Sequence, residues 1–337
     1  MTLLSADAYV KGVLAGDRTL LARAITLVES DAPRDQELSQ EVLQGLWAHT
    51  GRARRIGITG APGVGKSTFI EAFGSFLTEQ HKRVAVLAID PSSQRTGGSI
   101  LGDKTRMNRL SRDPNAFIRP SPSGTTLGGV ARKTREALLV CEAAGFDVVI
   151  VETVGVGQNE IAVRSMVDFF LLMLLPGGGD ELQGIKKGIV ELADALFVNK
   201  ADGKNGARAT QTQTEYQSAL KYTAPATPQW RTEVFSGSAL EEKGVDTLWA
   251  TIDRFYRDLE AKGVLKERRA QQTLNWLNDL VRDRLNRWFF TDPAVQHLLP
   301  AIEDDVLAGR LTVTAAVSSL FNVFEGAKNK IDKGVRV

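Results

Sequence analysis

The feature that most constrains this chain is the run from Arg55 to Thr68, which reads RIGITGAPGVGKST. From Gly60 to Ser67 it matches the pattern G-x-x-x-x-G-K-[ST], and a short apolar run at 56–59 precedes it. The residues that follow read as the start of a helix, so the motif has the strand–loop–helix context of a phosphate-binding loop. Glycines allow a tight turn whose N–H groups point at one anion, and the helix N-terminus adds partial positive charge. The sequence therefore predicts a nucleoside triphosphate site.

Two side chains of this loop have distinct predicted roles. Lys66 is placed to reach the β- and γ-phosphates, and we expect it to serve catalysis as well as binding. The hydroxyl of Ser67 is expected to hold Mg²⁺. The predicted nucleotide-binding loop comprises Gly60, Ala61, Pro62, Gly63, Val64, Gly65, Lys66, Ser67 and Thr68.

From residue 54 onward, short apolar runs alternate with helical patterns. The expected strands are 56–59, 84–89, 116–119, 148–151, 169–175, 196–199 and 233–235, and the expected helices are 67–80, 128–144, 159–166, 207–222 and 244–262. Several strands are almost continuously apolar, which indicates burial on both faces. This pattern predicts the α/β class, a P-loop NTPase fold with a mostly parallel central sheet flanked by helices.

Helical patterns also lie outside this alternation. Residues 5–48 are expected to form a helical hairpin divided at Pro33 and packed on the core. After the alternation stops, 266–289 reads as one long helix with apolar residues recurring every seven positions, and 297–307 and 312–327 read as shorter helices. A heptad-like stripe favours a dimerisation arm, with docking on the parent domain as the alternative. We divide the chain into an N-terminal helical extension (1–50), a P-loop domain (51–262) and a C-terminal helical dimerisation arm (263–337).

A second motif, Asn199-Lys200-Ala201-Asp202, follows a predicted strand and resembles the guanine-specificity motif of GTPases. Asp202 can accept from both N1–H and the exocyclic amine of guanine. Adenine lacks that pair of donors and would leave the carboxylate unpaired, which discriminates against it. The stem of Lys200 can lie along the base plane. A loop that would contact guanine O6 through its backbone is predicted at Ser238, Ala239 and Leu240.

Acidic residues at other strand ends are the candidate metal and catalytic groups. Glu152 begins an acidic-x-x-Gly motif and is expected near Mg²⁺, and Gly155 is placed to bind the γ-phosphate and sense its loss. Asp90 ends a strand and Asp103 lies in a glycine-rich loop, and both are candidates for the metal or the attacking water. Ras-like enzymes place a water-orienting glutamine directly after the glycine, but this chain has Val156 there. We therefore expect slow intrinsic hydrolysis that a partner or a rearrangement accelerates.

Composition limits the partners and the cellular location that we expect for this chain. The 337 residues include 42 basic and 40 acidic side chains, and this balance argues against a nucleic-acid or anionic-membrane partner. The single cysteine, Cys141, excludes an internal disulfide framework. Met1 to Asp7 lacks the regions of a signal peptide, and no stretch reaches the roughly 20 apolar residues of a membrane span. We expect a cytoplasmic protein, with a mature organellar form that has lost a transit peptide as the alternative.

On these residues the chain resembles the MeaB/ArgK family of P-loop GTPases over nearly its whole length. The segments that carry the resemblance are 60–68, 90–93, 151–158 and 199–202. The resemblance implies a chaperone of adenosylcobalamin-dependent methylmalonyl-CoA mutase that uses GTP binding and hydrolysis to gate cofactor loading and to protect or reactivate the mutase. It also implies a homodimer formed through the C-terminal helices.

Three other functions remain as alternatives. A nickel-delivering metallocentre GTPase needs clustered soft or imidazole ligands, whereas this chain has one cysteine and histidines far apart at 49, 81 and 297. A small-molecule P-loop kinase is disfavoured by Asp202 if GTP is preferred over ATP. A transport-system kinase would need a phosphoacceptor site, and no residue pattern marks one.

Overall fold

A parallel sheet of seven strands lies at the centre of residues 1–272, which form one compact unit, and residues 273–337 form a second. The computed structural model describes residues 4–90, 107–122, 127–153, 159–177 and 187–334. The side chains at 90, 121–122, 127–131, 159, 187 and 327–334 lie outside that description. Among the described residues, every helix is too short or too polar to cross a membrane.

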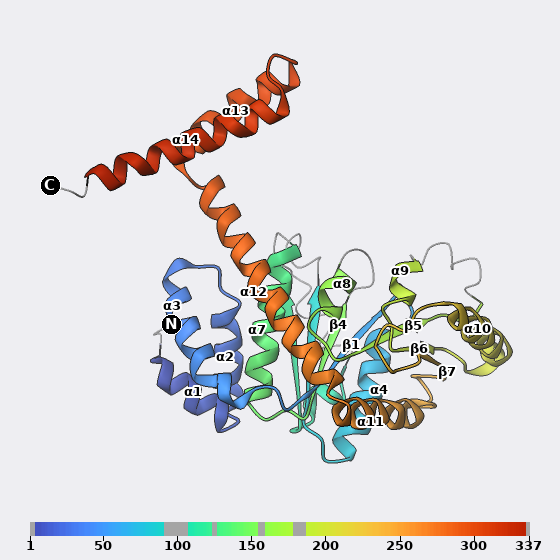
Figure 1. The fold of residues 1–337 in the computed structure, drawn as a ribbon. Helices are drawn as coiled ribbons and strands as arrows, with labels where there is room; N and C mark the ends of the chain where they lie inside the picture. Colours follow the sequence, from blue (N-terminus) through green and yellow to red (C-terminus); the bar gives the residue numbers. More distant parts are fainter. Residues whose placement is uncertain (1–3, 91–106, 123–126, 154–158, 178–186, 335–337) are drawn as a thin grey trace. The chain divides into compact units, whose positions relative to one another are not determined.

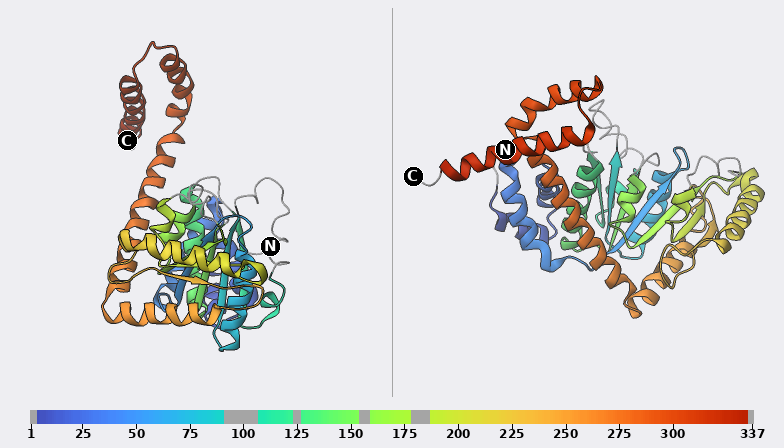
Figure 2. Two further views of the ribbon diagram at one scale, coloured as in Figure 1. Left: turned by 90° about the vertical axis from the view of Figure 1, so that its right-hand side faces the viewer. Right: turned by 45° about the horizontal axis from the view of Figure 1, so that its top comes forward.

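Every strand that the sequence predicted is present. The strands are β1 (Arg54–Gly60), β2 (Val84–Asp90), β3 (Ala116–Pro122), β4 (Val148–Thr153), β5 (Phe169–Leu174), β6 (Ala195–Val198) and β7 (Glu233–Ser236). They lie in the order β3-β2-β4-β1-β5-β6-β7, and all neighbours are parallel (Figures 1 and 2). The predicted α/β fold class is confirmed. Because all strands run in one direction, their carboxyl ends share one edge, where such sheets bind ligands.

Helices cover both faces of this sheet (Figure 2). In the first unit they are α1 (Ala6–Leu14), α2 (Arg18–Val28), α3 (Pro33–Leu46), α4 (Lys66–Glu79), α7 (Leu127–Ala143), α8 (Asn159–Arg164), α9 (Lys187–Val190), α10 (Gly206–Ala219) and α11 (Val245–Ala261), with short 3₁₀ turns η1 (Trp47–His49), η2 (Leu110–Arg112), η4 (Gly203–Asn205) and η5 (Leu220–Tyr222). Strand residues alternate between two cores: Val149 and Val151 pack with α1–α3, α7, α8 and α10. Val148 and Ile150 pack with α4 and α11. The strands are therefore buried on both faces, as their apolar runs predicted.

The N-terminal extension has three helices where the sequence indicated a hairpin. The additional break lies at Gly16, whose φ of +75° favours glycine. Asp17 then caps α2, because its carboxylate accepts the N–H groups of Thr19 (2.8 Å) and Leu20 (3.0 Å). Pro33 is the first residue of α3, a position where its missing N–H costs nothing.

The C-terminal helices are α12 (Val264–Phe290), α13 (Pro293–Leu307) and α14 (Val313–Gly334). The boundary between the two compact units falls within α12, after Gln272. In the second unit, the ring of Phe289 lies 4.7 Å from that of Phe321 and 4.9 Å from that of Phe324. The heptad positions Leu274 and Val281 are exposed, with 54% and 48% of their surface accessible.

Candidate nucleotide-binding site

The predicted phosphate-binding loop joins β1 directly to α4. Gly60 ends β1, and a Cβ there would lie 2.6 Å from the carbonyl oxygen of Met173 on the neighbouring strand. Gly65, with φ of +96°, precedes the first residue of α4, and a Cβ there would lie 2.7 Å from Nδ2 of Asn199. No other residue fits these two positions without displacement of the backbone or of the guanine motif.

Lys66 lies inside this loop and is only 8% exposed. Its Nζ donates to the carbonyl oxygens of Gly60 (2.8 Å) and Ala61 (3.3 Å). Burial lowers the pKa of Lys66, and the negative charges of Glu152 and Glu160 partly offset that effect. The ammonium group is therefore a shielded positive charge at the carboxyl edge of the sheet, suited to neutralising phosphate oxygens.

Two oxygen-bearing side chains meet beside Lys66. The hydroxyl of Ser67 donates to Oε1 of Glu152 over 3.3 Å, which links α4 to the end of β4. One residue further, the hydroxyl of Thr153 bonds to that of Thr59 on β1 at 2.7 Å. A hydroxyl and a carboxylate are hard oxygen ligands, so Ser67 and Glu152 fit Mg²⁺.

Three predicted residues of the phosphate region lie wholly or partly outside the described residues. Asp90 ends β2, which pairs with β4, but its side chain lies outside the described residues. Asp103 and Gly155 lie wholly outside them.

Asn199 connects the predicted guanine motif to both neighbouring loops. Its amide Nδ2 donates to the carbonyl of Val64 (2.9 Å), and its Oδ1 accepts the N–H of Ala239 (2.9 Å). The side chain of Lys200, whose backbone is left-handed, donates to the carbonyl of Gly63 (2.7 Å). The phosphate loop and the base-recognition loop are thereby fixed to one another.

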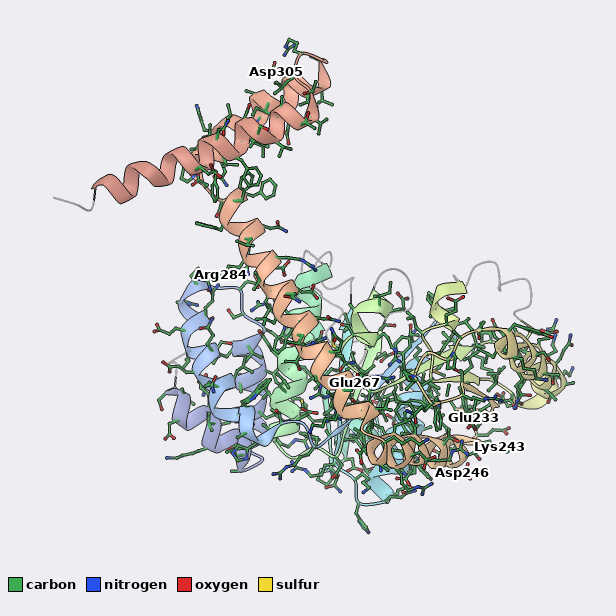
Figure 3. The ribbon with its side chains drawn as sticks, viewed as in Figure 1. Glu233, Lys243, Asp246, Glu267, Arg284 and Asp305 are labelled. Carbon is green, nitrogen blue, oxygen red and sulfur yellow. The ribbon has the colours of Figure 1, made fainter. Side chains whose placement is uncertain are left out.

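The loop after β7 completes this side of the site. The hydroxyl of Ser238 donates to Oδ1 of Asp202 at 3.0 Å. Ser238 and Lys243 close the loop by exchanging backbone hydrogen bonds of 3.1 and 3.0 Å, and Figure 3 labels Lys243 there. Ala239 is buried, whereas the side chain of Leu240 is 77% exposed, so only its backbone is suited to the predicted base contact.

Sequence reasoning missed Glu160. Glu160, in the first turn of α8, is 3% exposed and interacts electrostatically with Lys66. A Cβ at Gly237 would lie 2.3 Å from the carbonyl oxygen of Lys243, which explains the glycine in this loop. An acidic residue at the start of a predicted helix, just after the Glu152 motif, was the available signal for Glu160.

Fold and loop geometry together define a P-loop nucleotide-binding protein. A family model described as "Methylmalonyl Co-A mutase-associated GTPase MeaB" matches residues 21–294. The chain therefore belongs to the MeaB family of P-loop GTPases, which confirms the resemblance carried by its motifs.

Individual relatives support the same family assignment. A protein of Caulobacter vibrioides is 56% identical over 321 residues, which cover 95% of this chain and 98% of that one. The mouse protein "Methylmalonic aciduria type A homolog, mitochondrial" is 46% identical over 329 residues, covering 95% and 79%. A solved structure described as a LAO/AO transport system kinase superposes with a TM-score of 0.78 at 37% identity, covering 96% of this chain and all of that one.

Proposed function

We propose that this protein binds GTP and hydrolyses it to GDP and phosphate. The observation that carries the proposal is the pair of Asn199 hydrogen bonds, of which one ties the Asp202 loop to the Lys66 loop through Val64 and the other ties it to the loop at Ala239. A phosphate-binding group and a guanine-selective carboxylate are thereby held at a fixed separation. Such positioning is what phosphoryl transfer mainly requires of a protein.

The proposed role of each site residue follows from its chemistry. Lys66 neutralises phosphate charge, and the loop from Gly60 to Thr68 cradles the phosphates with its N–H groups. Ser67 and Glu152 hold Mg²⁺, with Asp90 and Asp103 as further candidate ligands or water-binding groups. The cation, when bound, neutralises charge on the phosphate oxygens. Base recognition falls to Asn199, Lys200, Asp202 and the loop Ser238-Ala239-Leu240.

Intrinsic turnover is proposed to be slow. Val156 follows Gly155 where Ras-like enzymes carry a glutamine, so the water-orienting group of that class is missing from its usual position. A partner that supplies or rearranges such a group would accelerate hydrolysis. Gly155 would then report the loss of the γ-phosphate.

The proposed partner is adenosylcobalamin-dependent methylmalonyl-CoA mutase. The description of the family and the name of the mouse relative support it. In this role the GTPase would gate cofactor loading and protect or reactivate the mutase in the cytoplasm. A pull-down from native extract with the GTP-analogue-bound protein tests this step, and recovery of no cobalamin enzyme would contradict it without touching the GTPase proposal.

We also propose that the chain forms a homodimer through the arm at 263–337, beside an N-terminal extension (1–50) and a P-loop domain (51–262). The exposed apolar residues of α12 support it; they are Leu274, Leu277, Val281, Leu285 and Trp288. Leu274, Val281 and Trp288 recur every seven positions with the two other leucines beside them, and this stripe suits pairing with a second copy of the same helix. Light scattering of Leu277→Glu against wild type tests it, with a monomer expected for the variant.

Lys66→Ala is the direct test of GTP hydrolysis. Loss of this cation is expected to slow single-turnover hydrolysis by about 10²- to 10³-fold, because phosphate charge then lacks its buried counter-charge. Lys221→Ala removes an exposed lysine and is the matched control. Competition between GTP and ATP for the wild-type site completes the test. Equal affinity for the two nucleotides would contradict the guanine assignment and favour the kinase alternative.

A further inference from the structure

A pair of buried threonine hydroxyls links the carboxyl ends of β1 and β4. The hydroxyl of Thr153 donates to that of Thr59 at 2.7 Å, and both residues are buried. The preceding residues of β4, from Val148 to Val151, are all apolar. Burial of a hydroxyl is unfavourable unless it is hydrogen-bonded, and two apolar side chains of the same shape would avoid that requirement. The pair therefore calls for a reason beyond packing.

The hydroxyl pair lies where the backbone pairing of these two strands ends. The last backbone partners on β1 and β4 are Ile58 and Glu152. Thr59 and Thr153 follow them directly, and the phosphate-binding loop begins one residue later at Gly60. The hydroxyl bond thus extends the link between the strands to the point where the chain leaves the sheet for the nucleotide site.

The end of β4 is held from both faces of the sheet. Side chains alternate between the two faces of a strand, so Glu152 lies on the same face as Ile150, which packs with α4. Thr153 lies on the same face as Val151, which packs with α7 and α8. On the α4 face, the carboxylate of Glu152 accepts from the hydroxyl of Ser67 over 3.3 Å. On the opposite face, the hydroxyl pair ties the adjacent residue of β4 to β1.

We propose that Thr59 and Thr153 are positioning residues for the Mg²⁺ site, which hold the carboxylate of Glu152 in its place beside Ser67. This inference rests on the proposed binding of GTP and Mg²⁺. Mg²⁺ demands nearly ideal ligand geometry, so a small displacement of one ligand weakens its binding. Without the hydroxyl pair, the end of β4 is held on one face only, and the carboxylate is less precisely placed.

The test is the affinity for Mg²⁺, measured by calorimetric titration of Mg²⁺ into protein saturated with a non-hydrolysable GTP analogue. Thr153→Val keeps the shape of the side chain and removes its hydroxyl. Groups that orient a metal ligand typically change metal affinity by about 10- to 100-fold. Because this pair acts through the residue next to Glu152, we expect a loss of about tenfold. Thr59→Val should show the same loss, and Thr153→Ser, which retains the hydroxyl, should keep the wild-type affinity.

The double variant Thr59→Val/Thr153→Val separates positioning from a merely structural role. Each single variant leaves one buried hydroxyl without its partner and should lower the melting temperature, whereas the double variant leaves none and should recover most of that loss. If the pair positions Glu152, the Mg²⁺ affinity of the double variant should remain about as low as in the single variants, because all three lack the same bond. Recovery of Mg²⁺ affinity together with the melting temperature would overturn the proposal.

Thr78→Val is the matched control, since this buried hydroxyl donates to the carbonyl of Ser75 (3.0 Å) near the far end of α4. It should lower the melting temperature and leave Mg²⁺ affinity unchanged. An equal loss of Mg²⁺ affinity in this variant would contradict a specific role for the pair, as would wild-type affinity in Thr153→Val. Failure of the wild-type protein to bind the GTP analogue would instead overturn the GTPase proposal.

Discussion

Both edges of the central sheet contain buried charged side chains, but the hydrogen-bond partners of these side chains differ between the two edges. At the carboxyl edge, Lys66 donates to main-chain carbonyls, and one oxygen of Glu160 lacks a hydrogen-bond partner among the described residues. At the amino edge, the fully buried Asp168 accepts hydrogen bonds from the N–H of Arg55 (3.1 Å), the hydroxyl of Tyr256 (2.9 Å) and two nitrogens of Arg269 (2.8 and 2.6 Å).

The pKa values at the amino edge follow the quality of this pairing. Burial alone would raise the pKa of Asp168, but hydrogen bonds and charge from Arg269, together with Arg55, outweigh it and lower the value. Asp194, equally buried, has longer ion pairs to Arg164 (3.3 Å) and Arg268 (3.9 Å). Burial prevails there, and the pKa of Asp194 is raised.

Buried charges at the two edges of the sheet differ in the kind of partner that they have. One whose partners are all fixed protein groups anchors structure, as Asp168 anchors the start of α12 through Arg269. One that retains capacity for a ligand serves binding. The short helix α8 contains Glu160 in its first turn, with one oxygen that forms no hydrogen bond to a described residue, and Arg164, paired with Asp194, at its end.

The largest expected effect comes from breaking the amino edge. Asp168→Asn leaves the guanidinium of Arg269 without its charged partner and should destabilise the fold by about 3–5 kcal/mol in chemical denaturation. The lowered pKa means that Asp168 stabilises the fold above its unfolded-state pKa, near 3.8, and loses that effect as pH falls through the folded-state value. The difference in unfolding free energy between wild type and variant should therefore become smaller at acidic pH.

Asp253→Asn is the control for that experiment. Asp253 pairs with Arg54 at 2.7 Å but is 45% exposed, so its loss should cost no more than about 1 kcal/mol. Both variants should bind GTP normally when folded. An equal loss of unfolding free energy in the Asp168 and Asp253 variants would contradict the contrast between the two edges. Loss of GTP affinity in the folded Asp168 variant would also contradict it.

Another buried carboxyl, Glu136 on α7, tests what happens when a buried acid is only partly paired. Burial raises its pKa to about 7, although the charges of Arg132 and Lys133 act against this shift. Its contribution to stability is therefore complete below the unfolded-state value of 4.5 and is lost as pH rises through 7. Relative to Glu136→Gln, wild type should lose roughly 2–3 kcal/mol across that window.

Denaturation of wild type and Glu136→Gln at pH 4.5, 6 and 8 measures this difference. Exposed Glu79→Gln supplies the control and should follow wild type at every pH. A pH-independent gap between Glu136→Gln and wild type would show that this carboxyl is fully paired, as Asp168 is.

The smallest expected effect belongs to the carboxyl edge. Ser238→Ala removes the hydroxyl that orients Asp202, and GTP should bind more weakly by about 1 kcal/mol. ATP affinity should be unchanged, because adenine does not use that carboxylate. Ser218→Ala, an exposed serine on α10, is the control, and equal losses for GTP and ATP would place Ser238 outside base recognition.

Much of the fold could be read from local patterns. Buried strands are recognisable in the sequence as apolar runs, and α12 as a long stripe of periodic apolar residues. Both patterns depend only on residues within one element. The loop from Gly60 to Thr68 and the motif from Asn199 to Asp202 are likewise contiguous. The break at Gly16 was missed because a single glycine within a helical pattern is a weak signal.

The sequence by itself thus determined the class of fold, the nucleotide motifs and the family. Only the tertiary structure decided which strands pair and that Asn199 joins Val64 to Ala239. It also decided that Arg269 meets Asp168, 101 residues away. Contacts of this kind depend on how the chain crosses over the sheet, and no local periodicity encodes them.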